Sequence, residues 1–217
     1  MNTQVYFIDG PQAVGKDFVV NYLYNRFQPQ LKEKCQVLRA TDFFPERLNS
    51  ELRKYSAYNT EERKTAAIAA SHTKIFDTID EMSLSGVKLI FVNRGVLSSL
   101  AYNLYRPDQI EDRQIYIRWY ADLVNRYAKF VDIHFLTLRE DVDVVISRLH
   151  NRNDGKVIDR DWTQQLHNNY FEAVREFSQH TTNVRQLGQY TTKHTVLQSS
   201  ANWLNAIGSL IQQKLEK

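Results

Sequence analysis

The stretch that decides how this chain folds is Ile8-Asp9-Gly10-Pro11-Gln12-Ala13-Val14-Gly15-Lys16-Asp17. It follows the apolar run Val5 to Ile8 and precedes an amphipathic segment from Phe18 to Phe27. Gly10 and Gly15 stand five positions apart with a lysine next, the spacing at which a strand turns into a helix through a loop whose backbone N–H groups enclose a phosphate. The stretch therefore predicts a strand, a phosphate-binding loop and a helix, in that order.

Phosphate contacts in this loop are expected from its backbone and from Lys16. The unpaired N–H groups at the start of the following helix, together with its dipole, favour an anion at the same place. The residues expected around the phosphates of a bound nucleotide are Gly10, Gln12, Ala13, Val14, Gly15, Lys16 and Asp17. Asp17 departs from the usual pattern, in which a Ser or Thr after the lysine binds Mg²⁺ through its hydroxyl. An ordinary glycine-containing turn is the alternative interpretation.

The composition fits one α/β domain, since 217 residues with 42% hydrophobic side chains are enough for a continuous core. The net charge is only +3, so it does not demand a polyanionic partner larger than a nucleotide and leaves DNA binding open. Cys35 is the sole cysteine, which excludes an internal disulfide and predicts a cytoplasmic setting, the host cytoplasm if the protein is viral. With neither a leader pattern nor an apolar run near ~18 residues, we expect a soluble protein.

Strands and helices alternate along the rest of the chain. We expect strands at 5–8, 36–40, 88–92 and 133–138, with a last strand inside 183–198, where 184–187 and 195–197 compete. We expect helices at 46–55, from residue 60 for about 25 residues, at 97–105, after Asp108, and at 142–152, 162–177 and 203–215. This order predicts an α/β fold: a five-stranded parallel sheet with helices on both faces and right-handed crossovers.

Polar residues follow two of these strands at the point where each strand ends. Thr41-Asp42-Phe43-Phe44-Pro45 comes after the second strand and Asn93-Arg94-Gly95 after the third. Because such sheets bind ligands at the carboxyl ends of their strands, we expect Asp42 and Arg94 to face a ligand. For Asp42, a helix cap or turn aspartate is an equal alternative. A polar, glycine-containing break at Asn153 to Lys156 predicts a mobile flap.

With these segments in place, the chain resembles the thymidylate kinase and deoxynucleoside kinase superfamily of P-loop kinases over most of its length. Ser98 to Tyr102 is similar to the thymidylate kinase motif, and Asn103-Leu104-Tyr105 to the nucleoside kinase one. Residues 148–158 are similar to the family's lid and 165–170 to the helix after it. Asp17 after the Walker A lysine resembles phosphomevalonate kinases and some bacteriophage deoxynucleoside monophosphate kinases. The resemblance implies a single three-layer P-loop NTPase domain over 1–217, with a helical lid at about 148–160.

The resemblance also implies the roles of individual residues in phosphoryl transfer from ATP with Mg²⁺. Lys16 would hold the donor phosphates, Arg94 the acceptor's phosphate or 5′ oxygen, and Asp42 would accept the proton of the attacking hydroxyl or orient the acceptor. Arg148 and Arg152 lie four apart, on one helix face, and would close over the transferring group. A solvated helix face is the alternative for these two arginines. Where the family often adds another lid arginine this chain has an aspartate at 154.

Two features of the resemblance concern the metal and the acceptor base. Asn93 stands where the family has the acidic residue that helps order Mg²⁺, while Asp17 supplies a carboxylate, so we hypothesise that the charge has moved across the site and that Asp17 is the metal-binding candidate. Candidates for stacking on the base are Phe43, Phe44, Tyr102, Trp119 and Tyr120. Asn103 stands near the place of the family's base-contacting glutamine, and Ser71 or His72 at the helix position that faces the base edge.

These expectations lead to a cytoplasmic kinase of deoxynucleotide metabolism that phosphorylates a deoxynucleoside monophosphate of the dTMP type, or its parent nucleoside. One alternative keeps the chemistry but changes the acceptor to a hydroxymethyl pyrimidine such as hydroxymethyluracil, as a nucleotide or within DNA, and a positive groove beside the site would favour it. An alternative of another class is a degenerate fold that binds nucleotide without catalysis. The expected partners are a small nucleotide or nucleoside and, through the aromatic stripe of the helix after Asp108, a second copy of the chain.

Overall fold

The computed structural model describes residues 2–48, 55–57, 59–103, 105, 110–152, 158–181, 192–198 and 203–216. Its strands are β1 (Gln4–Asp9), β2 (Cys35–Arg39), β3 (Leu89–Asn93), β4 (Asp132–Arg139) and β5 (Thr192–Gln198). Its α-helices are α1 (Lys16–Leu31), α2 (Glu61–Leu84), α3 (Val96–Asn103), α4 (Ile110–Tyr127), α5 (Val142–Arg152), α6 (Arg160–Thr181) and α7 (Trp203–Leu215). Three short 3₁₀ helices are η1 (Lys32–Lys34), η2 (Ala40–Phe43) and η3 (Glu46–Leu48).

The strands form one 5-stranded sheet in the order β2-β3-β1-β4-β5, in which every neighbouring pair is parallel. β1 lies at the centre, where Ile8 is in register with Asn93 of β3 and Leu136 of β4. Because the strands run in one direction, the segments that follow them leave the sheet at the same edge. The predicted α/β fold with a parallel sheet is confirmed, and the phosphate-binding loop, the segment after β2 and Arg94 meet at this edge.

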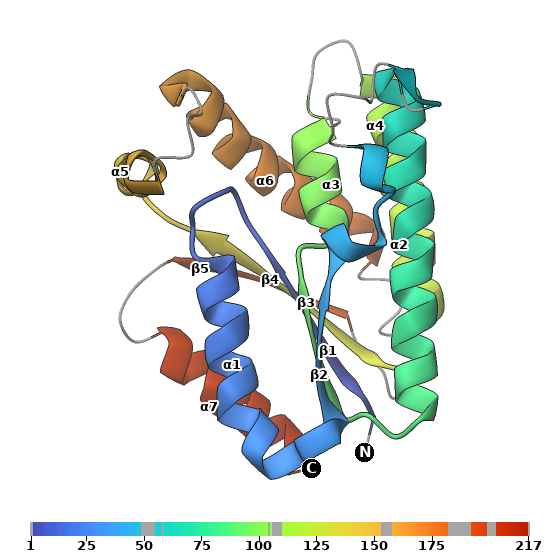
Figure 1. Ribbon diagram of the computed structural model, residues 1–217. Helices are drawn as coiled ribbons and strands as arrows, with labels where there is room; N and C mark the ends of the chain where they lie inside the picture. The colour runs from blue at the N-terminus through green and yellow to red at the C-terminus, as the bar shows by residue number, and fades with distance from the viewer. Residues whose placement is uncertain are drawn as a thin grey trace.

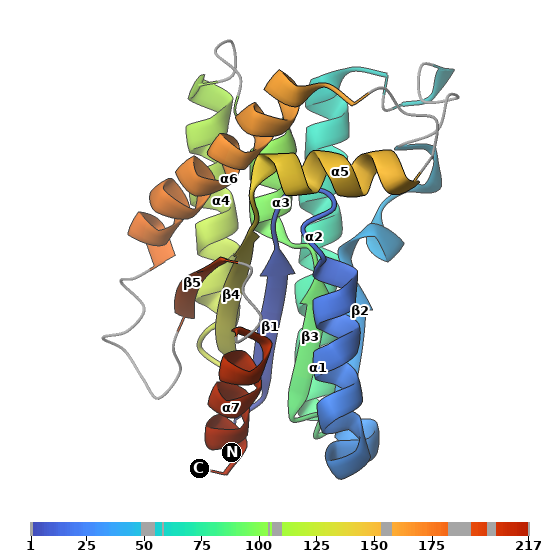
Figure 2. The same cartoon turned by 90° about the vertical axis from the view of Figure 1, so that its left-hand side faces the viewer.

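Helices cover both faces of the sheet, with α1 and α7 on one side and α2 and α4 on the other (Figure 1). Alternate residues of β1 divide between the two layers: Val5 and Phe7 pack with α2, α4 and α6, while Tyr6 and Ile8 pack with α1 and α7. All four of these β1 side chains are fully buried, as expected of a parallel strand covered on both faces. Figure 2 shows α5 crossing the end of the sheet toward which the arrowheads point, above the loop between β1 and α1.

Several boundaries differ from those predicted. The second strand is Cys35–Arg39, because Ala40 already begins the 3₁₀ helix η2. Where an α-helix is predicted to begin at Glu46, the structure has only the 3₁₀ helix η3, and residues 49–54 lie outside the described part of the chain. Of the two competing segments for the last strand, residues 195–197 fall within β5, whereas 184–187 lie outside the described residues. Thr60 caps α2 by accepting a hydrogen bond from the Arg63 N–H.

The aromatic stripe predicted for the helix after Asp108 is largely used inside the chain itself. Tyr120, Leu123 and Val124 of α4 are buried in the core, while Trp119 is 38% exposed and Phe130 57%. The stripe therefore leaves only part of its apolar surface for a second copy, and the homodimer stays a prediction. Among the described residues, none of the helices combines the length and the apolarity needed to cross a lipid bilayer.

Candidate functional site

The loop between β1 and α1 has the backbone conformation that a phosphate-binding loop requires. Gly10 (φ 140°) and Gly15 (φ 98°) lie at positive φ, as does Ala13 (φ 58°). A Cβ on Gly10 would lie 2.7 Å from the Leu138 carbonyl oxygen, so only glycine fits there. Gly15 is the N-cap of α1 and gives it no side-chain hydrogen bond. The first N–H groups of α1 consequently point toward the loop without a side-chain cap, which is the arrangement that binds anions.

Lys16 folds back over this loop. Its Nζ donates hydrogen bonds to the carbonyl oxygens of Gly10 at 2.8 Å and Pro11 at 2.5 Å. Burial, together with the nearby positive charge of Arg94, lowers the pKa of the Lys16 ammonium to about 7, against the opposing effect of Asp9. An anionic phosphate in the loop would offset both effects, because it supplies the negative charge that two carbonyl dipoles only partly provide.

Asp9, which the sequence analysis does not single out as a site residue, ties the loop to the segment that carries Arg94. Its Oδ1 accepts hydrogen bonds from the Gly95 N–H at 2.9 Å, the Ser98 N–H at 3.1 Å and the Ser98 hydroxyl at 2.5 Å. The Tyr170 hydroxyl of α6 donates in turn to Ser98 Oγ at 2.8 Å. Its place was visible in the sequence, since an acidic residue ends a buried apolar strand directly before the first glycine of the loop.

Arg94 adopts a strained backbone conformation that fixes where its side chain goes. Its φ is 67°, in the left-handed region that a residue with a Cβ rarely occupies. Its N–H donates to the Ile8 carbonyl at 3.0 Å, while the next residue is held by Asp9, so both sides of the strained position are anchored to the end of β1. The guanidinium carbon lies 5.7 Å from the centre of the Tyr102 ring. Strain of this kind persists only where surrounding contacts hold it, and it is concentrated at functional sites.

A cavity of about 480 Å³ opens beside Arg94. Its walls come from five separate parts of the chain: the loop after β1, the segment after β2, helix α2, the segment from Arg94 into α3, and helix α6. The predicted residues among those that line it are Gln12, Phe44, Arg94, Tyr102 and Asn103, joined by Ser98, Ser99 and Trp162. The volume lies within the range of about 300–1,000 Å³ that small-molecule sites occupy, so it has room for a nucleotide.

Six other residues predicted to bind the acceptor are not on the wall of this cavity, and two of them, the partly exposed Trp119 and the buried Tyr120, belong to α4. Asp42 is exposed and lines neither cavity described here, although its neighbour Thr41 does line the 480 Å³ one. Phe43 and Ser71 line a second cavity on the other side of Phe44. His72 is fully buried behind the first cavity, with its Nε2 3.5 Å from Ser99 Oγ.

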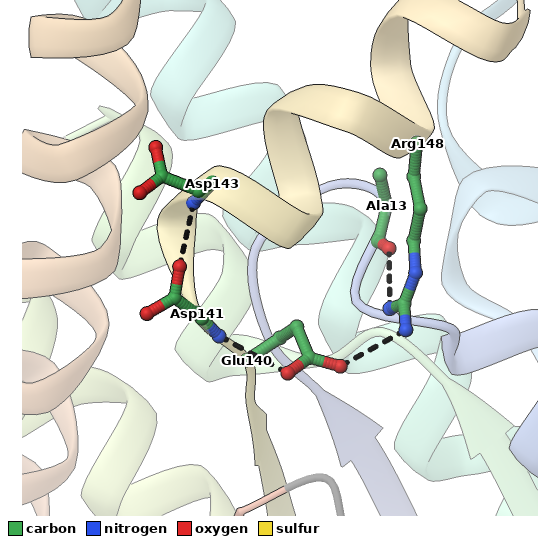
Figure 3. Close-up of polar contacts among 5 residues, drawn as sticks. All are labelled: Ala13, Glu140, Asp141, Asp143 and Arg148. Carbon is green, nitrogen blue, oxygen red and sulfur yellow. Dashed lines mark hydrogen bonds and ion pairs between the residues drawn. The ribbon is translucent and has the colours of Figure 1, made fainter.

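Helix α5 delivers Arg148 to the phosphate-binding loop. Its Nη1 donates to the Ala13 carbonyl at 3.3 Å and its Nη2 pairs with Glu140 Oε2 at 3.0 Å (Figure 3). Glu140 Oε1 also accepts a hydrogen bond from the Asp141 N–H, and Asp141 Oδ1 accepts one from the Asp143 N–H in the first turn of α5. These hydrogen bonds connect the start of α5 to the carboxylate that holds Arg148. Arg152 is exposed one turn later, near enough for its charge to lower the pKa of Lys16. Residues 153–157 of the predicted lid, including Asp154, lie outside the described residues.

Asp17 and Asn93, the two positions of the hypothesised charge exchange, are in direct contact. Asn93 Nδ2 donates to Asp17 Oδ1 at 2.5 Å, and Asn93 Oδ1 is buried with no hydrogen-bond partner among the described residues. No group of three His, Cys, Asp or Glu side chains that could hold a metal ion occurs among the described residues. Mg²⁺ needs no such group, because it keeps several waters and takes one or two carboxylates plus phosphate oxygens. The exposed Asp17 carboxylate beside an unpartnered amide oxygen therefore fits Mg²⁺ bound with a nucleotide.

Comparison with known proteins supports the fold. No protein-family model matches the chain, and neither does any curated protein sequence. Among solved structures 316 chains match, including thymidylate kinase from Ehrlichia chaffeensis, with a TM-score of 0.61 and 14% sequence identity over 99% of this chain and 100% of that one. At this identity the match shows the fold, which is the one that the resemblance implies. A bacteriophage origin stays a prediction.

Proposed function

We propose that the protein is a nucleotide kinase that transfers the γ-phosphoryl group of ATP to a deoxynucleoside monophosphate of the dTMP type. The observation that carries the proposal is the convergence of Lys16, Arg94 and Arg148 on one end of the sheet, next to a cavity of nucleotide size. These cations come from three segments far apart in the sequence. Phosphoryl transfer asks a protein chiefly for such a convergence, because negative charge spreads over the transferring group in the transition state.

The donor half consists of the loop from Gly10 to Asp17. The N–H groups at the start of α1 and the Lys16 ammonium would hold the β- and γ-phosphates, and Arg148 would turn from the Ala13 carbonyl toward the γ-phosphate. Mg²⁺ would be held by Asp17, with Asn93 beside it, and would neutralise phosphate charge when bound. Lys16 already faces this loop, so its change of partner from carbonyl to phosphate needs only a side-chain movement.

The transfer step is a displacement at the γ-phosphorus. An acceptor oxygen forms a bond to that phosphorus while the bond to the oxygen bridging the β- and γ-phosphates breaks, and ADP leaves with the electron pair. Arg94, at the mouth of the cavity, would position the acceptor's phosphate in line with the donor.

The charged residues that line the cavity distinguish between a monophosphate and a nucleoside as the acceptor. None of the described residues that line it is an Asp or Glu, and Asp42 stands outside it. A phosphate oxygen is already ionised near neutral pH, whereas the hydroxyl of a nucleoside needs a base to take its proton. The lining therefore supports a monophosphate acceptor more strongly than a nucleoside, and a role for Asp42 as the base stays a prediction. Tyr102, Trp162 and Asn103 would contact the base.

A substrate screen with purified protein tests the proposal. ATP, Mg²⁺ and a coupled assay for ADP would be combined with each deoxynucleoside, each monophosphate and the 5-hydroxymethyl pyrimidine counterparts, free and in DNA. We expect ADP release that depends on a pyrimidine monophosphate. Turnover restricted to the hydroxymethyl compounds would favour the modified-pyrimidine alternative. ATP binding without ADP release for any acceptor would contradict catalysis and indicate the degenerate nucleotide-binding alternative, which the Asn93 and Asp17 departures motivate.

A further inference from the structure

A second cavity, of about 730 Å³, adjoins the one beside Arg94. It lies between α2 and the segment after β2, two elements that run side by side in Figure 1. Phe44 lines both cavities, so a single aromatic side chain forms the boundary between them. The two hollows are thus neighbouring compartments of one groove along α2.

The size of the groove exceeds what the proposed acceptor needs. The 480 Å³ cavity alone falls within the usual range for a small-molecule site. The second cavity, at about 730 Å³, is larger than the first, and none of the cations assigned to donor or acceptor phosphates lines it. A monophosphate bound at Arg94 would leave this compartment open.

Helix α2 lines the second compartment with two cationic side chains and with small side chains between them. Arg63, Ala67, Ala70 and Lys74 follow one another at intervals of four, three and four residues and so share one face of the helix. Both cations are exposed at the ends of this row, with small side chains between them. Opposite them stand the partly buried rings of Phe43 and Phe44. A flat ring would fit between aromatic walls and an alanine floor, with a phosphate at either end.

The charge of the whole groove favours an anion longer than one nucleotide. The residues that line the two compartments include four cations, Arg63, Lys64, Lys74 and Arg94, and one carboxylate, Glu46. The chain as a whole is nearly balanced, with 28 basic and 25 acidic residues. Lys64 pairs with Glu61 at 3.5 Å, a partly exposed pair of the kind that contributes little and that a phosphate can displace. Arg63 and Lys64 are adjacent in sequence and line different compartments, so they straddle the boundary.

We propose that the acceptor is the 5′-phosphorylated terminal nucleotide of a single-stranded oligonucleotide: this unit occupies the compartment at Arg94 and the next unit along the strand occupies the compartment at Lys74. The phosphodiester between them crosses at Phe44, beside Arg63 and Lys64. Aromatic walls with flanking cations are the common means of binding single strands, because every base has a face to stack and every linkage a charge. This inference rests on the proposed kinase activity and specifies its substrate class.

The first experiment is a length series. The nucleoside 5′-monophosphate that the substrate screen identifies is written pN, where p is the 5′ phosphate. It would be compared with the 5′-phosphorylated dinucleotide pNpN and with the 5′-phosphorylated hexamer of the same nucleotide, at equal concentration of 5′ ends. We expect kcat/KM to rise about tenfold from pN to pNpN, as one stacked base and one phosphate are added, and to change little from pNpN to the hexamer. Equal values for pN and pNpN, or slower turnover of pNpN, would overturn the inference while leaving the kinase proposal intact.

Two substitutions in α2 test where the second unit binds. Ala70→Trp fills the compartment, and Lys74→Glu reverses the charge at its end; each should bring the pNpN to pN ratio close to one while the rate on pN stays within twofold of wild type. Lys129→Glu reverses an exposed charge in the turn before β4, remote from both compartments, and should keep the full ratio. An undiminished ratio in both α2 variants, with thermal unfolding unchanged, would contradict this location.

A binding measurement made without ATP tests the oligonucleotide groove independently of the kinase activity. Anisotropy of a labelled dT hexamer would be measured without ATP, in wild type and Lys74→Glu, over a range of salt concentrations. We expect binding that weakens with salt and falls about fivefold in Lys74→Glu. Hexamer binding without phosphorylation of any acceptor would support the groove and contradict the kinase. Hexamer binding that Lys74→Glu leaves unchanged would contradict the groove.

Discussion

The donor and acceptor halves of this site are built in opposite ways. The proposed donor half is one continuous stretch, Gly10 to Asp17, in which backbone groups would do most of the binding. The acceptor cavity is assembled from side chains of the loop after β1, η2, α2, α3 and α6, which lie far apart in the sequence, from Gln12 to Trp162. The hydrogen-bonded chain from Asp9 through Ser98 to Tyr170 joins the two halves.

Because the two halves are built differently, substitutions in one half can change its ligand without changing the other half. A loop whose function comes from N–H groups tolerates few changes at its glycines but places no demand on distant segments. A cavity made of side chains can change its ligand by single substitutions, as long as its scaffold holds.

The largest effects are expected when one cation is removed from each half. Lys16→Met and Arg94→Met should each lower kcat by about 10³, because each removes positive charge where negative charge develops. Calorimetry with ADP and Mg²⁺ should show that Lys16→Met weakens nucleotide binding while Arg94→Met leaves it unchanged. Lys129→Met is the matched control. If Arg94→Met weakened ADP binding as much as Lys16→Met, the two halves would not be separate.

The scaffold of the acceptor half should be sensitive to acid through His72. Its Nδ1–H donates to the Ile68 carbonyl at 2.9 Å, and burial lowers its pKa to about 4. The unfolded chain, with a His pKa near 6.5, binds a proton first as pH falls, so His72 removes about 3 kcal/mol of stability between pH 6.5 and pH 4. Urea unfolding across this range should show a steeper loss in wild type than in His72→Leu. Parallel curves for the two proteins would mean that His72 ionises normally.

The hypothesised charge exchange predicts that removing the Asp17 carboxylate weakens Mg²⁺ binding and that a carboxylate at position 93 restores it. Asp17→Asn should raise the Mg²⁺ concentration for half-maximal activity about tenfold, because the carboxylate beside the phosphates is gone. The double variant Asp17→Asn with Asn93→Asp should recover most of it, since the two side chains are in hydrogen-bonding contact. A single variant with normal Mg²⁺ dependence would rule out Asp17 as the metal-binding residue.

The smallest effects are expected at the link between the halves. Ser98→Ala should raise the KM for the acceptor about tenfold and Tyr170→Phe about threefold, because Arg94 loses support that acts through Asp9. Affinity for ADP should change less than twofold in both, and Ser98→Thr should restore the acceptor KM. Tyr6→Phe is the matched control, as Tyr6 is fully buried and its hydroxyl finds no hydrogen-bond partner in the described part of the chain. Equal losses in acceptor and nucleotide affinity would indicate general destabilisation instead.

Sequence reasoning was most successful where chemistry is local. The loop, the parallel strands and the long α2 were predicted because glycine spacing and apolar runs depend on neighbouring residues only. Asp9 was missed because a single acidic residue at a strand end gives no local sign of its three partners in a segment 86 residues later. His72 was placed at the acceptor base, yet only packing shows that it lies behind Ser99.

By itself the sequence determined that a glycine-containing loop joins a buried strand to a helix in an alternating α/β chain, because backbone conformation and burial are properties of short segments. Only the tertiary structure decided which side chains share a cavity. It brought Gln12, Phe44, Arg94 and Trp162 together and left Asp42 outside. The physical reason is that parallel strands carry segments from distant parts of the chain to one edge, and the direction of each side chain there depends on contacts between those segments.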